Sequence, residues 1–153
     1  MKRFSKSVLG VTLLEIMLVL AIAAMVIVMS VRYYQSATAS QQTNATLELI
    51  QAITAAADNL SQSTGTYSGV STATVAPLLP GGGTTITTQW GTNIGIVGAA
   101  SSYVVTIGTV PAQVCPLLVS RLSANKNFKS TPATAAACTG AAADVTYTYT
   151  ANP

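Results

Sequence analysis

The chain has no histidine and few charged side chains of any kind. Charged residues make up 7% of its 153 residues, whereas about a quarter is usual in a globular domain. The four acids, Glu15, Glu48, Asp58 and Asp144, are scattered, so a carboxylate pair would form only through folding. Two cysteines without histidine make a poor zinc site, and scattered acids make a poor calcium site. We therefore expect a protein that is not an enzyme and that has no metal and no cofactor.

Basic residues are in excess only at the start of the chain. The formal net charge is +3, and Lys2, Arg3 and Lys6 account for it, because the remaining four bases balance the four acids. Nucleic-acid binding would require a basic surface in the rest of the chain. Only a short cluster within residues 121–129 offers one, and we interpret it as a solvated loop. We expect no nucleic-acid partner.

Helix-breaking residues are absent from a long N-terminal stretch. No proline precedes Pro77, and no glycine lies between Gly10 and Gly65. Because both residue types destabilise helix interiors, we predict one helix from Val11 to about Ser61.

The two halves of this predicted helix differ in composition. Residues 11–31 carry one charge, Glu15, and as a helix they would span about 31 Å, the thickness of a bilayer's hydrocarbon core. We predict a transmembrane segment whose start is held in the cytoplasm by the preceding bases. Residues 32–62 are more polar, and we predict that they form an amphipathic helix with one side covered by a globular domain. Their sparse apolar stripe consists of Leu47, Ile50, Ile53 or Ala57, and Leu60.

Two other interpretations of this segment remain open from the sequence. One is a membrane anchor followed by a separate soluble helix. The other is an ordinary signal peptide cut at Ala37–Ala39. A simple signal peptide has a shorter apolar run, and it has no use for Glu15 inside that run. We therefore favour a helix that is retained.

Glu15 is a candidate functional residue, because a carboxylate in hydrocarbon is costly unless it is neutralised or paired. Proteolysis after Gly10 would make Val11 a positively charged N-terminus four residues before Glu15. In a staggered stack of helices, Glu15 of one copy would meet the amino group of Val11 in its neighbour. This pair would set the axial register, because a slipped stack leaves both charges unpaired.

The N-terminal motif has a short basic stretch from Lys2 to Gly10, the hydrophobic residue Val11 and the acid Glu15 four positions later. This pattern resembles the class III signal of type IV prepilins and pseudopilins. The resemblance implies cleavage after Gly10 by a prepilin peptidase, N-methylation of Val11 and an assembly role for Glu15. The motif departs from the family at Val11, where phenylalanine, methionine or leucine is more usual.

The remainder of the chain is typical of a small β-rich domain. Strict alternation in the last predicted strand places Val145, Tyr147 and Tyr149 on one face. Pro116 would lie in the first turn of a short helix or kink it. The expected elements are strands at Thr84–Thr88, Asn93–Val97, Ser102–Ile107 and Val145–Thr150, a helix from Pro111 to about Leu122, and a loop over Lys126–Gly140. The predicted fold class is α+β, with a long N-terminal α-helix packed on a small antiparallel β-sheet, as in the pilin fold.

Both cysteines, Cys115 and Cys138, lie far downstream of the predicted membrane segment. Export would allow them to form a disulfide, whose loop of about 24 residues would stabilise the domain by roughly 3 kcal/mol in the chain-entropy model. Two unrelated buried thiols are the alternative. The order of elements from Gly65 to Pro153 also resembles the type IVb pilins, in which a cysteine pair closes a C-terminal loop region on the filament surface.

These observations predict a structural protein. The resemblance implies a type IV pilus subunit that waits in the inner membrane, is cut by the peptidase, and is polymerised by an assembly platform and its ATPase. The product would be an extracellular homo-oligomeric filament for adhesion, aggregation or motility. A pseudopilin of a type II secretion system and a monomeric membrane-anchored periplasmic binding module are the alternatives. The expected parts are a leader at 1–10, a transmembrane and filament-core helix at 11–31, an amphipathic helix at 32–62, and a head at 63–153 with a disulfide loop at 115–138.

Overall fold

The computed structural model describes residues 12–138 and 142–151. The chain divides into two compact units, Met1–Ala37 and Thr38–Pro153, and each is described by itself. The predicted processing residues, Gly10 and Val11, lie outside the described residues.

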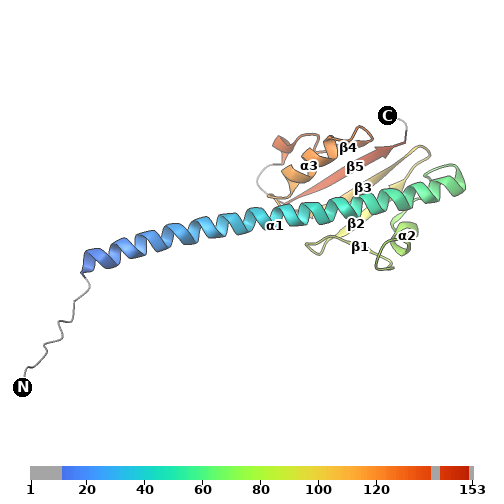
Figure 1. Ribbon diagram of the computed structural model, residues 1–153. Coiled ribbons are helices and arrows are strands. Elements are labelled where there is room, and N and C mark those ends of the chain that lie inside the picture. Colours follow the sequence, from blue (N-terminus) through green and yellow to red (C-terminus); the bar gives the residue numbers. More distant parts are fainter. Residues whose placement is uncertain (1–11, 139–141, 152–153) are drawn as a thin grey trace, which may run out of the picture. The chain divides into compact units, whose positions relative to one another are not determined.

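Helix α1 is one uninterrupted α-helix of 52 residues, Leu13–Thr64 (Figure 1). This confirms the prediction of a single long helix, which ends three residues later than expected. The end is set by Gly65, whose φ of 75° is a left-handed conformation that glycine adopts without a steric cost. The amide of Gly65 donates to the carbonyl of Ser61 at 2.7 Å, which closes the last turn.

The C-terminal half of α1 buries one face in the second unit. The predicted stripe is confirmed at Ile50, Ile53 and Ala57, which are buried, while Leu47 and Leu60 are partly buried. Thr43 and Thr46 extend the buried face toward the N-terminus. Their hydroxyl groups donate to backbone carbonyls four residues earlier, at 2.7 and 2.8 Å, so neither of these two hydroxyl groups lacks a partner.

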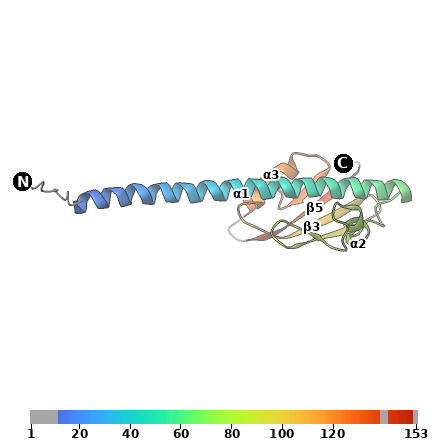
Figure 2. The same ribbon diagram turned by 60° about the horizontal axis from the view of Figure 1, so that its bottom comes forward.

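The second unit contains a five-stranded antiparallel sheet in the order β1-β2-β3-β5-β4. Figure 2 shows the part of α1 that belongs to this unit, residues 38–64, along one face of the sheet. The α+β fold class is therefore confirmed. The elements after α1 are α2 (Thr72–Val75), the 3₁₀-helix η1 (Ala76–Leu78), β1 (Ile86–Thr87), β2 (Asn93–Gly98), β3 (Ser102–Val110), α3 (Cys115–Ser123), β4 (Phe128–Thr131), the 3₁₀-helix η2 (Ala135–Ala137) and β5 (Ala143–Thr150).

Two parts of the sequence prediction are wrong. The predicted loop Lys126–Gly140 contains the edge strand β4, which pairs with β5 from Phe128 to Thr131. Four residues are too few to show an alternating pattern, so tertiary pairing decides their conformation. The basic cluster within residues 121–129 is therefore not a loop alone, because it runs from α3 through a turn into β4. The short helices α2 and η1 were also not predicted.

The tyrosines of the sheet form an aromatic cluster in the core. Tyr103 and Tyr147 are fully buried, and the rings of Tyr103 and Tyr149 stack with centroids 5.0 Å apart. The hydroxyl of Tyr103 lies 3.1 Å from that of Thr54 on α1. Among the described residues, the buried hydroxyl of Tyr147 has no hydrogen-bond partner. Burial raises the pKa of Tyr103 and of Tyr147, because the phenolate form is poorly solvated there.

The loop after α1 covers the exposed edge of β2. The amide of Ile96 donates to the side chain of Thr72 at 2.9 Å, and Ser71 forms an isolated bridge with Val97. The Thr72 side chain therefore accepts a hydrogen bond from a β2 amide that the short strand β1 does not reach. This contact protects the edge of β2 from pairing with strands of other chains.

Gly98 allows this loop to approach the sheet. A Cβ atom at Gly98 would overlap the backbone carbonyls of Tyr67 and Val70. Since backbone atoms cannot move aside as a flexible side chain can, any larger residue would displace the loop.

Replacing Gly98 with alanine is expected to destabilise the head by about 1–3 kcal/mol, because the added methyl group meets backbone atoms. Urea unfolding of the detergent-solubilised chain, followed by the fluorescence of Trp90, measures this. Gly95→Ala is the matched control, because a Cβ there lies 4.0 Å from Thr106 and is in ordinary contact. An unchanged urea midpoint for Gly98→Ala would show that the loop is not held as described.

Stability is expected to fall in alkali. A tyrosine with a raised pKa stabilises the fold fully below its unfolded pKa of about 10, and this contribution is lost as the pH rises above that value. Tyr147→Phe is expected to be neutral or stabilising at pH 7, because it removes a buried hydroxyl that lacks a partner among the described residues. It is also expected to reduce the alkaline loss. Unfolding midpoints at pH 7 and above pH 10 test both points, and an identical alkaline loss in the variant would contradict them.

Candidate functional site

Glu15 lies in the first turn of α1. Thr12 begins the helix, because its carbonyl accepts from the amides of Glu15 and Ile16 at 3.0 and 3.2 Å. The Thr12 hydroxyl lies 3.3 Å from the amide of Glu15 and helps to satisfy this helix start. A carboxylate in the first turn also interacts favourably with the positive end of the helix dipole. The sequence therefore places an acid where a helix N-terminus tolerates it best.

The apolar side chains around Glu15 are not covered by the described chain. Every large hydrophobic residue of α1 from Leu13 to Val31 is between 50% and 78% exposed. Glu15 is exposed, and its carboxylate has no hydrogen bond or ion pair with another described residue. The helix is long and apolar enough to cross a membrane. This surface requires a covering of lipid or protein, because water disfavours so much contiguous apolar area.

After the first turn of α1, the helix supplies its own backbone hydrogen bonds through this segment, as an apolar environment demands. The one hydroxyl group between Leu13 and Val31 belongs to Ser30, near the end of the run, and it donates to the carbonyl of Val26 at 2.8 Å. Glu15 is therefore the residue of this segment whose polar side chain has no hydrogen-bond or ion-pair partner in the described chain.

Cys115 and Cys138 form a disulfide, as the sequence predicted. Cys115 is the first residue of α3, and Cys138 directly follows η2. The bond connects residues 23 positions apart and fixes the segment that carries α3 and β4. Pro116 lies in the first turn of α3, where a helix needs no amide donor, so the predicted kink is not required.

Two acids have structural partners that sequence reasoning missed. The Tyr67 hydroxyl donates to Asp58 at 2.8 Å. The amide of Thr109 donates to Asp144 at 2.8 Å, which holds Thr109 at a φ of 52° where β3 bulges against β5. No sequence signal links these residues, because both pairs depend on the fold. Within 12–138 and 142–151, no three histidine, cysteine or acidic residues gather into a possible metal site.

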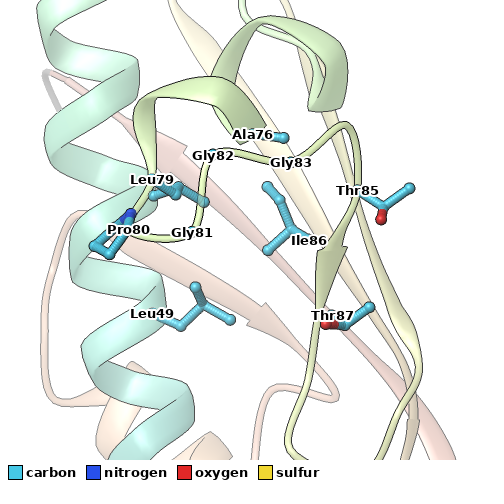
Figure 3. Close-up of a pocket in the computed structure, with 10 residues that line it drawn as sticks. All are labelled: Leu49, Ala76, Leu79, Pro80, Gly81, Gly82, Gly83, Thr85, Ile86 and Thr87. Atoms are coloured by element: carbon cyan, nitrogen blue, oxygen red, sulfur yellow. The ribbon is translucent and has the colours of Figure 1, made fainter.

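A second surface feature lies beside the C-terminal half of α1 (Figure 3). Leu49 of α1 faces a loop of three glycines, and Gly81 and Gly82 have φ values of 118° and 52° that favour glycine. This loop and β1 form one side of an open groove of about 250 Å³. We call it the α1–β1 groove, lined by Leu49, Leu79, Pro80, Ile86 and Thr87. No sequence pattern predicted this groove.

Comparison with protein-family models, with curated protein sequences and with solved structures finds no match to this chain. The N-terminal motif and the fold are therefore the two features of the chain that point to a function. A long apolar N-terminal helix, a small antiparallel sheet and a disulfide are compatible with a pilin-like fold.

Proposed function

We propose that this protein is the precursor of a type IV pilin-like subunit that polymerises into an extracellular filament. The observation that carries the proposal is the apolar helix surface from Leu13 to Val31, which the rest of the described chain leaves uncovered. It contains a single acid, Glu15, which has no ion pair with another described residue. A lipid bilayer would cover this surface before assembly, and copies of the same helix would cover it afterwards.

Burial of the helix supplies the bulk of the assembly free energy. Each Å² of apolar surface removed from water contributes about 25 cal/mol before the costs of association. Apolar contact is not directional, so it does not fix how far one helix slides along another. A specific polar pair is needed to choose one axial register.

Glu15 and the amino group of Val11 are the proposed pair. Cleavage after Gly10 creates this amino group, and Glu15 of an adjacent subunit accepts its charge. In apolar surroundings an unpaired charge is strongly disfavoured, so the correct register is the one that pairs both groups. The pair thus selects the axial register between neighbouring helices, while apolar contact provides the affinity.

The second unit remains on the outside of the proposed filament. Its core is complete without a partner, since the buried face of α1 already packs with the sheet. The disulfide keeps the α3–β4 segment closed outside the cell, where oxidation is maintained. Such a head presents loops to solvent for adhesion or aggregation.

Glu15→Ala is expected to leave cleavage intact and to lower the yield of sheared surface filaments to less than about a tenth, because the Val11 amine then lacks its partner. Immunoblotting of precursor and mature chain measures cleavage, and electron microscopy of the sheared fraction measures filaments. Glu15→Gln is expected to behave likewise, since it keeps the size of the side chain but not its charge.

Ser30→Ala is the matched control in the same helix, because its hydroxyl group bonds only to the carbonyl of Val26. Its filament yield is expected to equal that of the unmodified chain. Abundant filaments from Glu15→Ala would remove the proposed role of Glu15.

A further inference from the structure

Helix α1 carries few charges, and the unpartnered ones alternate in sign. Its charged side chains are Glu15, Arg32, Glu48 and Asp58. Asp58 already accepts a hydrogen bond from Tyr67. The other three are exposed, and none of them has an ion pair with another described residue. Along its length the helix therefore presents an acid, a base and an acid that lack partners within the described chain.

Arg32 directly follows the apolar surface of α1. The apolar run ends at Val31, and Arg32 is exposed at the next position. While that surface lies in a bilayer, the long side chain of Arg32 would reach the headgroups and water at the membrane edge. Packing of the same surface against other copies would remove much of this water, and a desolvated charge needs an opposite charge nearby. The need of Arg32 for an acid thus arises on assembly.

Glu48 is the acid that remains for Arg32. The chain has four acids. In the proposed function Glu15 pairs with the new N-terminus, and Asp58 and Asp144 already accept hydrogen bonds within the second unit. Glu48 has no such partner among the described residues.

Glu48 also lies where a second helix could reach it. The buried face of this half of α1 contains Thr46, Ile50 and Ile53, whereas Glu48 is exposed. Among the exposed positions of α1 from residue 38 to residue 64, Glu48 is the one charged residue, and the others are neutral, mainly Gln, Asn, Ser and Thr. This strip therefore offers a single charge for recognition and no further charge that would repel or compete.

We propose that two α1 helices in the filament lie parallel and staggered, with Arg32 of one subunit paired with Glu48 of another. The inference rests on the proposed filament and adds a second register contact to it. Sixteen residues separate the two positions along α1. Because an α-helix rises about 1.5 Å per residue, the two subunits are offset by about 24 Å along the helix axis.

The stagger follows from the order of the charges. In the proposed filament all subunits come from the same membrane in one orientation, so their helices are parallel. Without an offset, Arg32 would face Arg32 and Glu48 would face Glu48, and contacts between like charges are unfavourable. An offset of sixteen residues brings a base to an acid instead.

This pair and the pair of Val11 with Glu15 join different neighbours. Four residues separate Val11 from Glu15, so that pair corresponds to an offset of about 6 Å rather than 24 Å. A subunit in a helical filament has neighbours at several axial offsets. Because Arg32 and Glu48 are different positions of the chain, their contact leaves one of each free at the two ends and can propagate.

Cysteine cross-linking tests the pair in whole filaments. In the variant Arg32→Cys with Glu48→Cys, oxidation of sheared filaments is expected to give a ladder of multimers on a non-reducing gel. A bond within one chain is excluded, because the positions lie about 24 Å apart on the helix and a disulfide requires Cα atoms within about 7 Å. The native cysteines are joined to each other, so the introduced thiols are the reactive ones.

Arg32→Cys with Asn59→Cys is the matched control. Asn59 is exposed and lies three turns after Glu48 on nearly the same side of α1, about 16 Å farther along the helix. This variant is expected to stay monomeric, because the helix face is right and the axial position is wrong. Equal ladders from the two variants would show contact without register and would overturn the proposal.

A charge swap provides a second measurement that needs no cross-link. Arg32→Glu and Glu48→Arg are each expected to lower the yield of sheared filaments by about tenfold through like-charge contact, and the double variant is expected to restore it. Immunoblotting of precursor and mature chain checks that each variant is still inserted and cleaved. Glu48→Arg with Arg121→Glu is the control, because Arg121 is an exposed base of the second unit, and no rescue is expected.

The outcomes separate the two proposals. Normal filament yield from both single reversals, or filaments of the double cysteine variant that give no ladder, would overturn the pair and leave the proposed function standing. Rescue of Glu48→Arg by Arg121→Glu would assign Glu48 to the head of a neighbour and would also overturn it. Absence of filaments from the unmodified chain would remove the proposed function and this inference together.

Discussion

The role proposed for this protein depends on an apolar helix surface that no other described part of the chain covers. From Leu13 to Val31 the large side chains of α1 are at least half exposed. Water disfavours this arrangement, so the segment is stable only in lipid or against other apolar surfaces. The second unit thus has a buried apolar core, whereas the apolar side chains of the first unit are exposed among the described residues. The proposed transfer from a bilayer into a polymer requires such a surface.

In the proposed filament, burial and register would be carried by different residues. Apolar contact along the helix is extensive but unspecific, whereas Glu15 is a single group with a directional requirement. The hydroxyl groups of Thr43 and Thr46, for which we propose no role in assembly, each donate to a backbone carbonyl of their own helix.

Features with a local cause could be predicted from the sequence. The length of α1 follows from the lack of glycine and proline, and its end follows from Gly65. The alternation at Val145 and Tyr147 correctly gave their burial. The disulfide between Cys115 and Cys138 followed from their number and the expectation of export. The N-terminal motif is local as well, although Gly10 and Val11 lie outside the described residues.

Features that depend on distant parts of the chain could not be predicted. Strand β4 is too short to show a period, and it exists because β5 offers a free edge. The partners of Asp58 and Asp144 come from a tyrosine and a bulge that the sequence does not connect to them. The α1–β1 groove requires the glycine loop to face Leu49, which no pattern along the chain records.

The central claim is that proteolysis creates the positive group that Glu15 needs, and mass spectrometry of sheared surface filaments tests it most directly. The account predicts an N-terminal peptide that begins at Val11 and carries one methyl group on its amine. A mature chain that begins near Ser40 would have lost the apolar half of α1 and would contradict the account.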